Sequence, residues 1–386
     1  MIKVNWQFGD STTLAKYNGS PIIDQESIYI SAGNFNNPIL YSINAQTGKE
    51  QWHYSFDNRD CDIYASPKIY GNNIYVSSVR GKLLSLDASS GSLNWEAEIE
   101  KSISLSPLKS SVIIVDKILY VGSNNGYLCS FDADTGEELD KIKVIDNRAV
   151  NTPVYANDQK TICVETSDGS VHAVDLNTQE VRWRYFDGDP TLNFYGFPVV
   201  NNGIVYSGGG STNFAALDLE SGDKIWNFKP KSVQAFTSPA VADGIVCFAN
   251  YNGMIWGANC NDGQILWSYK TITTLKNVAF GWLSTPVISE QKVFLGGRGY
   301  LRSLELQTGK EIWKYAAPCS ENIIFEPMNL IFETFNQIGK LLIDNTFSAF
   351  YDPLVKDNLI YIVAKNGSFH RLLSLTVETM VRTKFE

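Results

Sequence analysis

Cysteine pairs are absent from this sequence of 386 residues. Its six cysteines lie far apart, with no adjacent pair and no Cys-x-x-Cys motif, so the sequence indicates neither a zinc site nor a dithiol redox motif. We expect these thiols to be unpaired and mostly buried, as in a protein from a reducing compartment. They are Cys61, Cys129, Cys163, Cys247, Cys260 and Cys319.

Excess positive charge and long apolar runs are also missing. The net charge of −9 and the isoelectric point near 5.0 argue against nucleic acid or an anionic membrane as a partner. No apolar run reaches the length needed to span a bilayer, and residues 1–6 lack the hydrophobic core of a signal peptide. We therefore expect no nucleic-acid partner, no membrane insertion and a cytoplasmic location.

What the sequence does contain is a repeat built around tryptophan. Six of its nine tryptophans each follow the end of an Asp-x-x-Thr-Gly-like turn by four residues. Successive positions are 43, 45, 43, 43, 41 and 46 residues apart, which is the length of a four-stranded propeller blade. The third position carries Asp140 instead. The six are Trp52, Trp95, Trp183, Trp226, Trp267 and Trp313.

Each repeat predicts a small antiparallel sheet. A proline opens the first strand, where its missing amide is tolerated, and a β-branched or aromatic run such as 73–76 follows. Asn-Gly or Asp-Gly dipeptides, as at 125–126, then favour a hairpin into a third strand that ends in Asp. The tryptophan falls on the fourth, outer strand, where we expect it to pack between adjacent blades.

Counting the opening prolines predicts the architecture. There are eight, so we predict an all-β, eight-bladed β-propeller of four-stranded antiparallel blades that forms one domain over residues 1–386. Either terminal segment, 4–8 or 381–385, could close the ring as the outer strand of the last blade. We favour 4–8 because it contains Trp6. The prolines are Pro21, Pro67, Pro107, Pro153, Pro198, Pro239, Pro286 and Pro353.

One repeat is longer than the others. Pro286 and Pro353 are 67 residues apart where other opening prolines are 40 to 47 apart, and the surplus falls within about 319–350. After Pro327 the apolar residues follow an i, i+3, i+4, i+7 pattern, which predicts a short amphipathic helix inserted between blades seven and eight. Whether this helix caps the propeller, covers its channel or docks another protein stays open.

The repeated run Leu-x-Ser/Ala-Leu-Asp-x-x-Thr-Gly-x-x-x-Trp resembles the repeat of the pyrroloquinoline-quinone-type β-propellers. That superfamily includes the quinoprotein alcohol dehydrogenases and the propeller lipoprotein of the bacterial outer-membrane barrel-assembly machinery. The resemblance covers about residues 1–316 well and 351–386 weakly. It implies the propeller fold, whereas the residues of the motif build turns and blade contacts rather than a site.

Two departures from the dehydrogenases bear on the cofactor. Those enzymes carry an adjacent cysteine pair near the quinone and a set of calcium-binding acidic and amide residues, and neither pattern occurs in this sequence. We therefore expect no pyrroloquinoline quinone and no calcium. The assembly lipoprotein is closer in length, although its lipidation site has no counterpart in residues 1–6. The resemblance to it implies a scaffolding role.

Residues suited to catalysis are few. There are three histidines, and His172 and His370 occupy the same third-strand position in repeats that should lie on opposite sides of a ring, so they cannot share a metal ion. His53 follows Trp52 on an expected outer strand. The glycine-rich run 207–211 lacks the Lys-Ser/Thr of a phosphate loop and reads as a hairpin turn. We predict no catalytic residue and no metal site.

The unequal loops are the best candidates for binding. In a propeller, the connections between blades lie on the same face as the hairpins between second and third strands. Here they carry arginines and large aromatic residues, which anchor interfaces when a rigid scaffold displays them. Phe280 and Trp282 could instead plug the channel or cover a blade. The candidates are Arg59, Asp62, Arg80, Arg148, Tyr195, Phe280, Trp282 and Arg298.

Two functions remain open on these grounds. We favour a monomeric, non-catalytic platform that binds a protein partner or a small-molecule ligand at the face that carries these loops. The alternative is an enzyme or a cofactor-binding protein, with its pocket in the central funnel under the segment 319–350. A deep cavity with converging charged groups would favour the enzyme, and a broad aromatic surface the platform.

Overall fold

The computed structural model describes most of the repeated part of the chain. The described residues are 3–8, 16–17, 20–34, 37–56, 65–78, 80–99, 110–156, 160–187, 197–208, 213–230, 236–250, 253–271, 284–297, 300–316, 354–356, 359–364 and 368–373. They contain only strands, turns and loops, and so include no helix that could cross a membrane. The predicted helical insertion at 319–350 lies outside the described residues.

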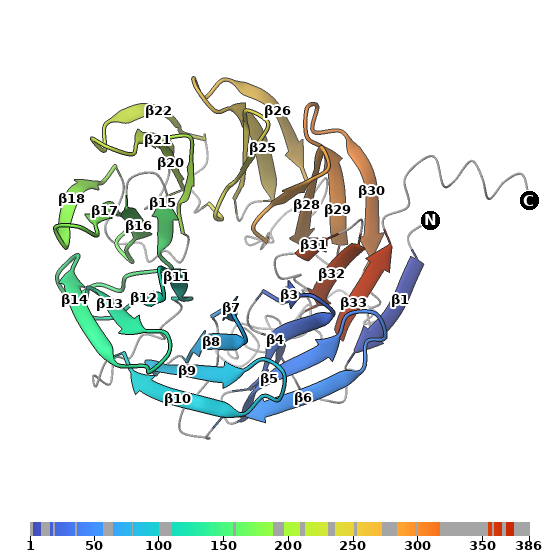
Figure 1. Cartoon of the computed structure of the whole chain (residues 1–386). Helices are drawn as coiled ribbons and strands as arrows, with labels where there is room; N and C mark the ends of the chain where they lie inside the picture. The colour runs from blue at the N-terminus through green and yellow to red at the C-terminus, as the bar shows by residue number, and fades with distance from the viewer. Residues whose placement is uncertain are drawn as a thin grey trace, which may run out of the picture.

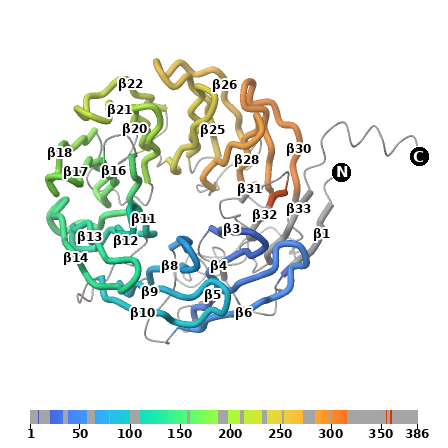
Figure 2. Tube along the Cα trace, in the orientation of Figure 1, coloured from blue at the N-terminus to red at the C-terminus, as the bar shows by residue number. Residues whose placement is uncertain are grey.

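The strands form antiparallel sheets arranged around a central axis (Figure 1). The coloured trace in Figure 2 passes from sheet to sheet in chain order. We number the blades one to seven and call the last the closing blade. Blade one comprises β2 (Lys16–Tyr17), β3 (Ile22–Asp24), β4 (Ser27–Asn34), β5 (Asn37–Asn44) and β6 (Glu50–Ser55). Blade two comprises β7 (Lys68–Tyr70), β8 (Asn73–Ser77), β9 (Lys82–Asp87) and β10 (Leu93–Glu98). Blade three comprises β11 (Ile113–Val115), β12 (Ile118–Gly122), β13 (Tyr127–Asp132) and β14 (Glu138–Lys143).

The remaining blades repeat this plan. Blade four comprises β15 (Val154–Ala156), β16 (Thr161–Glu165), β17 (Val171–Asp175) and β18 (Glu180–Tyr185). Blade five comprises β19 (Val199–Asn201), β20 (Ile204–Ser207), β21 (Phe214–Asp218) and β22 (Lys224–Phe228). Blade six comprises β23 (Ala240–Ala242), β24 (Ile245–Ala249), β25 (Met254–Asn259) and β26 (Ile265–Lys270). Blade seven comprises β27 (Val287–Ser289), β28 (Lys292–Gly297), β29 (Tyr300–Glu305) and β30 (Glu311–Ala316). The closing blade comprises β31 (Leu354–Lys356), β32 (Leu359–Ala364), β33 (Ser368–Leu373) and β1 (Lys3–Phe8).

The predicted fold class needs correction. Seven sheets have four strands, but the sheet of blade one has five, because both β2 and β3 pair with β4. β4 is eight residues long, so its inner edge accommodates both short strands. The prediction of eight uniform four-stranded blades with a helical insertion is therefore wrong: the four-stranded blades number seven, and the described residues include no helix.

The ring closes through the N-terminal strand. β1 pairs antiparallel with β33, with Phe8 opposite Phe369 and Lys3 opposite Leu373. In Figure 1 this dark blue strand lies beside the red strands from the other end of the described chain. The favoured assignment of segment 4–8 as the closing strand agrees with this pairing. Joining strands from the two ends removes a free sheet edge that an open array would expose.

A turn precedes each outer strand, and the side chain of the first residue in that turn accepts the hydrogen bonds that hold it. In blade two, Asp87 Oδ1 accepts hydrogen bonds from the amides of Ser89 (3.0 Å) and Ser90 (2.8 Å) and from both hydroxyl groups. The hydroxyl and amide bonds hold the pKa of this carboxyl below its usual value, since they favour the charged form. Asp132 and Asp218 make equivalent amide bonds in their own turns. The predicted role of the repeated Asp is thus confirmed.

The repeated tryptophan connects neighbouring blades at five of the contacts between them. Its indole N–H donates to a backbone carbonyl in the following blade, that of the residue directly after the Asp, Asn or Glu that opens the turn. The bonds run from Trp52 to Ala88 (3.0 Å), Trp95 to Ala133 (3.1 Å), Trp183 to Leu219 (2.9 Å), Trp226 to Cys260 (2.8 Å) and Trp267 to Leu306 (2.8 Å). The predicted packing between blades is confirmed. Trp226 and Trp267 are buried, whereas Trp95 is partly exposed.

The same ring contact requires glycine in the next turn. A Cβ added at Gly309 would lie 2.4 Å from the ring of Trp267, and the φ of Gly309 is +67°. Both the space and the backbone angle therefore exclude a side chain. Blade three carries Asp140 in place of tryptophan, and the turn that it faces carries Gln179, which keeps a φ of +59°. Without the indole there is room for a side chain in that turn. The absence of tryptophan at position 140 therefore explains the absence of glycine at position 179.

This pairing predicts unequal effects at equivalent turn positions. Gly309→Gln should lower the free energy of unfolding by about 1–3 kcal/mol, because the new side chain must displace the Trp267 ring and adopt a left-handed backbone. Gln179→Gly should change it by less than about 1 kcal/mol, since no indole contacts that turn. Urea unfolding followed by tryptophan fluorescence measures both. Equal losses of unfolding free energy in the two variants would contradict a specific contact between the Trp267 ring and Gly309.

Candidate functional site

The structure describes two of the eight predicted binding residues. Arg80 lies in the hairpin between β8 and β9, and Arg148 lies in the connection from β14 to β15; both are exposed. Arg59, Asp62, Tyr195, Phe280, Trp282 and Arg298 lie outside the described residues. Their role in binding stays a prediction.

Hydrogen bonds place the connection and the hairpin on one face, as predicted. Ala149, next to Arg148, accepts a bond from the amide of Ser167 (2.8 Å) and donates its own amide to Ser167 Oγ (3.1 Å). Val150 forms a β-bridge with Thr166. Ser167 belongs to the hairpin between β16 and β17. We call the surface made by these hairpins and blade connections the loop face.

Blade four carries an exposed arginine and aromatic pair on the loop face. Arg184 stands at the end of β18 with its guanidinium 5.9 Å from the centre of the Phe186 ring, and both side chains are exposed. Arg184 Nη2 also lies 3.0 Å from Asp168 Oδ2, whose side chain is only 8% exposed. A carboxylate from the hairpin below thus holds the arginine in place. The predicted binding residues do not include this pair, because those residues lie in loops and Arg184 lies at the end of a strand.

Asp168 is itself held by the hairpin. Its Oδ1 accepts bonds from the hydroxyls of Thr166 (2.6 Å) and Ser170 (2.7 Å) and from the Ser170 amide (3.0 Å). Burial would raise the pKa of Asp168, but these bonds and the charge of Arg184 outweigh it and lower the pKa below its ordinary value. Asp168 therefore stays ionised and presents a fixed negative charge beneath Arg184.

His172 completes this network but is poorly placed for catalysis. Its Nε2 lies 2.8 Å from Ser170 Oγ, and its Nδ1 has no partner among the described residues. Burial first, and Arg184 second, lower the pKa of His172 to about 4, so the ring is neutral at pH 7. Thr166, Ser170 and His172 are each at most 1% exposed, which leaves a substrate no access. The geometry fits a structural support for the hairpin.

The ring also separates the strands that carry two of the three histidines. β17, which carries His172, and β33, which carries His370, lie on opposite sides of the ring (Figure 1). This agrees with the prediction that they cannot share an ion. The described residues contain no group of three or more His, Cys, Asp and Glu side chains able to hold a metal ion. The free thiols of Cys129, Cys163, Cys247 and Cys260 are buried, as expected.

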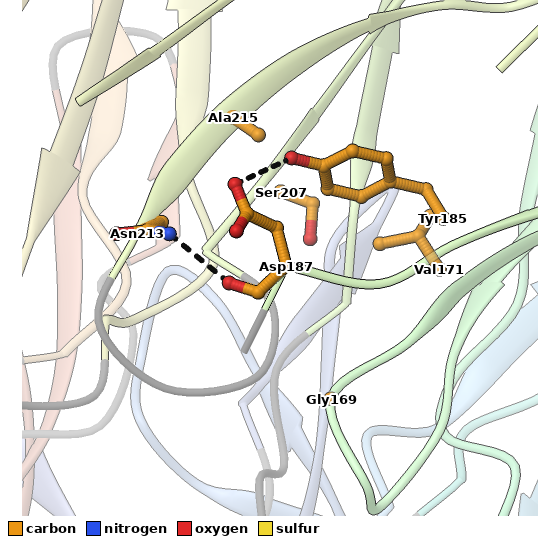
Figure 3. A pocket seen from close by; sticks show the side chains of 7 residues that line it. All are labelled: Gly169, Val171, Tyr185, Asp187, Ser207, Asn213 and Ala215. Atoms are coloured by element: carbon orange, nitrogen blue, oxygen red, sulfur yellow. Dashed lines mark hydrogen bonds between the residues drawn. The ribbon is translucent and has the colours of Figure 1, made fainter. Parts of the chain in front are cut away.

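A small cavity lies between blades four and five (Figure 3). The space open to the centre of a water molecule is about 10 Å³, which corresponds to one water. On one side, the hydroxyl of Tyr185 donates to Asp187 Oδ2 (3.0 Å), and the amide nitrogen of Asn213 donates to the Asp187 carbonyl (3.0 Å). The lining residues are Gly169, Val171, Tyr185, Asp187, Ser207, Asn213 and Ala215.

Ser207 connects this cavity to a buried acid. Its hydroxyl donates to Glu165 Oε1 (2.5 Å), and Glu165 is 2% exposed at the end of β16. Burial raises the pKa of Glu165 to about 7, with the Ser207 bond acting in the opposite direction. A buried acid with such a pKa is a common feature of active sites. Here, however, the adjoining cavity has room for one water molecule and none for a substrate.

A family model described as outer membrane protein assembly factor BamB matches residues 3–185 and 167–323. The BamB of Moranella endobia (strain PCIT) is 27% identical over 293 residues, which cover 70% of this chain and 71% of the relative. The crystal structure of BamB from Moraxella catarrhalis has a TM-score of 0.69 at 19% identity and covers 97% of this chain and 98% of its own. Quinohemoprotein alcohol dehydrogenase from Comamonas testosteroni has a TM-score of 0.69 at 12% identity, covering 97% of this chain and 78% of its own.

These matches confirm the resemblance to the pyrroloquinoline-quinone-type propellers and correct one expectation. At 12% identity, the likeness to the dehydrogenase concerns the fold alone. The predicted cytoplasmic location is wrong, because the matching relatives are named as outer membrane protein assembly factors. The prediction rested on the lack of a membrane-spanning apolar run, on residues 1–6 and on unpaired cysteines, and none of these features determines where a protein resides.

Proposed function

Because the chain belongs to the outer membrane protein assembly factor BamB family, we propose that it is a non-catalytic platform which binds a protein partner during outer membrane protein assembly. The observation that carries this proposal is the exposed pair of Arg184 and Phe186, which buried Asp168 holds on the loop face. The proposed place of action is accordingly the outer membrane, and we propose that no cofactor takes part.

The chemistry of this pair suits protein recognition. An arginine that is fixed before binding loses little conformational freedom on association, and arginine and aromatic residues supply much of the energy of protein interfaces. Arg184 keeps donors available beside Phe186, which offers apolar surface. The partner surface that fits is a carboxylate next to an apolar side chain. Arg148 and Arg80 are further exposed arginines on the loop face, at blades three and two.

Loss of the pair is expected to weaken binding without unfolding the ring. Arg184→Ala and Phe186→Ala should each reduce affinity for the partner by about 30-fold, the effect of a hot-spot residue worth about 2 kcal/mol. The measurement is crosslinking and capture from envelope extracts of the source cells, with quantitative mass spectrometry. Circular dichroism of each variant checks that the fold is kept.

The matched control is Lys310→Ala. Lys310 is exposed in the turn between β29 and β30, at the opposite ends of the strands from the loop face. This variant should capture the same partner as the wild type. Unchanged capture by both loop-face variants would contradict the proposed site, and turnover of a small molecule by the purified chain would favour the enzyme instead.

A further inference from the structure

The contact between blades four and five contains a buried acid in an otherwise apolar seam. Glu165 lies on β16 with Cys163 two residues earlier, and the seam around them is formed by Val171, Ala173, Val205, Ala215 and Leu217. The Ser207 hydroxyl is the side-chain partner that the described residues offer to this carboxyl. Ser207 belongs to β20 of blade five, so the hydrogen bond crosses the seam.

Ser207 also forms part of the wall of the one-water cavity (Figure 3). A buried water needs two to four polar partners, and this cavity is lined by the hydroxyl of Ser207, the side chains of Tyr185 and Asp187, and the amide of Asn213. The side chain of Asp187 is 40% exposed, so the polar wall of the cavity continues to the surface. The cavity therefore lies between solvent and the Glu165–Ser207 hydrogen bond.

The charged groups around the seam do not neutralise Glu165. On blade four, Asp168 is paired with Arg184, and burial raises the pKa of the Cys163 thiol to about 12, so it stays neutral. On the blade connection, Asp187 lies 3.7 Å from Lys224 of blade five, and burial raises the pKa of Tyr185, with the bond to Asp187 adding to the effect. Burial and the Ser207 bond are thus the influences that set the proton affinity of Glu165.

We propose that the cavity binds one ordered water, and that this water and Ser207 link the Glu165 carboxyl to solvent, so that ionisation of Glu165 loosens the seam between blades four and five. The protonated acid is neutral and fits the apolar seam. The carboxylate requires solvation that one hydroxyl does not supply, so more water must enter from the cavity side. Asp187, at the start of the connection from blade four to blade five, lines the cavity at this point.

Hydrogen exchange of the whole chain, measured by mass spectrometry at pH 6 and pH 8.5 and corrected for intrinsic rates, tests the loosening. Peptides spanning 161–171 and 203–208 should lose about tenfold or more of their protection at the higher pH. Peptides from the seam of blades six and seven, such as 245–249, should keep their protection at the higher pH. Glu165→Gln, which cannot ionise, should abolish the change. An equal change in Glu165→Gln, or none in the wild type, would overturn the proposal.

Two further variants keep the idea testable if Glu165→Gln does not fold. Ser207→Ala removes the bond that favours the ionised acid, so the loss of protection should move to higher pH. Ala215→Val fills the cavity. A crystal structure of the wild type should show a water bonded to Ser207, and that of Ala215→Val should lack it. An empty wild-type cavity, or an unmoved pH midpoint in Ser207→Ala, counts against the water link.

Discussion

Trp267→Ala is expected to lower the free energy of unfolding by about 3–5 kcal/mol, the usual cost of removing a large aromatic side chain from a core. Trp267 is 7% exposed and packs against blade seven, where its indole donates to the Leu306 carbonyl (2.8 Å). The variant loses the packing and leaves that carbonyl without its partner. Urea denaturation followed by circular dichroism measures the loss.

Two control variants separate the parts of this effect. Trp267→Phe keeps most of the ring packing but removes the N–H donor, so it should cost about 1–3 kcal/mol. Tryptophan substituted for Asp140, together with Gln179→Gly, should restore the missing tryptophan contact between blades three and four and should not destabilise the ring. A loss below about 1 kcal/mol for Trp267→Ala would show that the indole is not a main element of the blade contact.

The Glu165→Gln variant is expected to become more stable relative to the wild type as pH rises from about 4.5 to 7. The acid has its ordinary pKa of 4.5 in the unfolded chain, and burial raises the pKa to about 7 in the folded chain. The contribution of Glu165 to stability is therefore full below pH 4.5 and is lost as pH rises through 7. A pKa difference of this size is equivalent to about 3 kcal/mol.

His172 should produce the opposite slope. Burial lowers its pKa from 6.5 to about 4, so its contribution to stability is full above pH 6.5 and is lost as pH falls through 4. In the wild type the two effects oppose each other between about pH 4.5 and 6.5. In Glu165→Gln the free energy of unfolding should rise with pH, because only the His172 effect remains. In His172→Gln it should fall with pH, because only the Glu165 effect remains.

Urea denaturation at pH 5, 6, 7 and 8 measures these slopes. Glu98→Gln, which changes an exposed acid at the end of β10, is the matched control and should run parallel to the wild type. If the curves of all three variants run parallel to the wild type, neither buried group titrates as its surroundings imply. These two buried residues of blade four would then contribute no opposed pH dependence to stability.

The repeat predicted much of the ring because its signals are local. Proline at a strand start, Asn-Gly or Asp-Gly at a hairpin and an Asp-led turn each act within a few residues. The hairpin detail was less predictable: the loop between β12 and β13 has four residues, 123–126, and only Gly126 among them has a positive φ, +98°. Loop length depends on how strands pair, which the dipeptide alone does not specify.

The extra strand of blade one was not predictable in the same way. β2 has two residues and no alternating pattern, and it pairs with β4 only because β4 extends beyond β3. The candidate site shows the same limit. Arg80 and Arg148 could be identified as loop arginines, whereas Arg184 matters because of Asp168, which lies sixteen residues away in the hairpin between β16 and β17.

By itself, the sequence determined the all-β repeat, the Asp-led turns and the tryptophan contacts between blades, because each repeat carries its own turn chemistry and its own apolar pattern. Only the tertiary structure decided that the first sheet has five strands, that β1 closes the ring against β33, and that Glu165 meets Ser207 across a seam. These features join residues that are distant in the chain. Their energies depend on burial and on partners from another blade, and neither property is written in any single repeat.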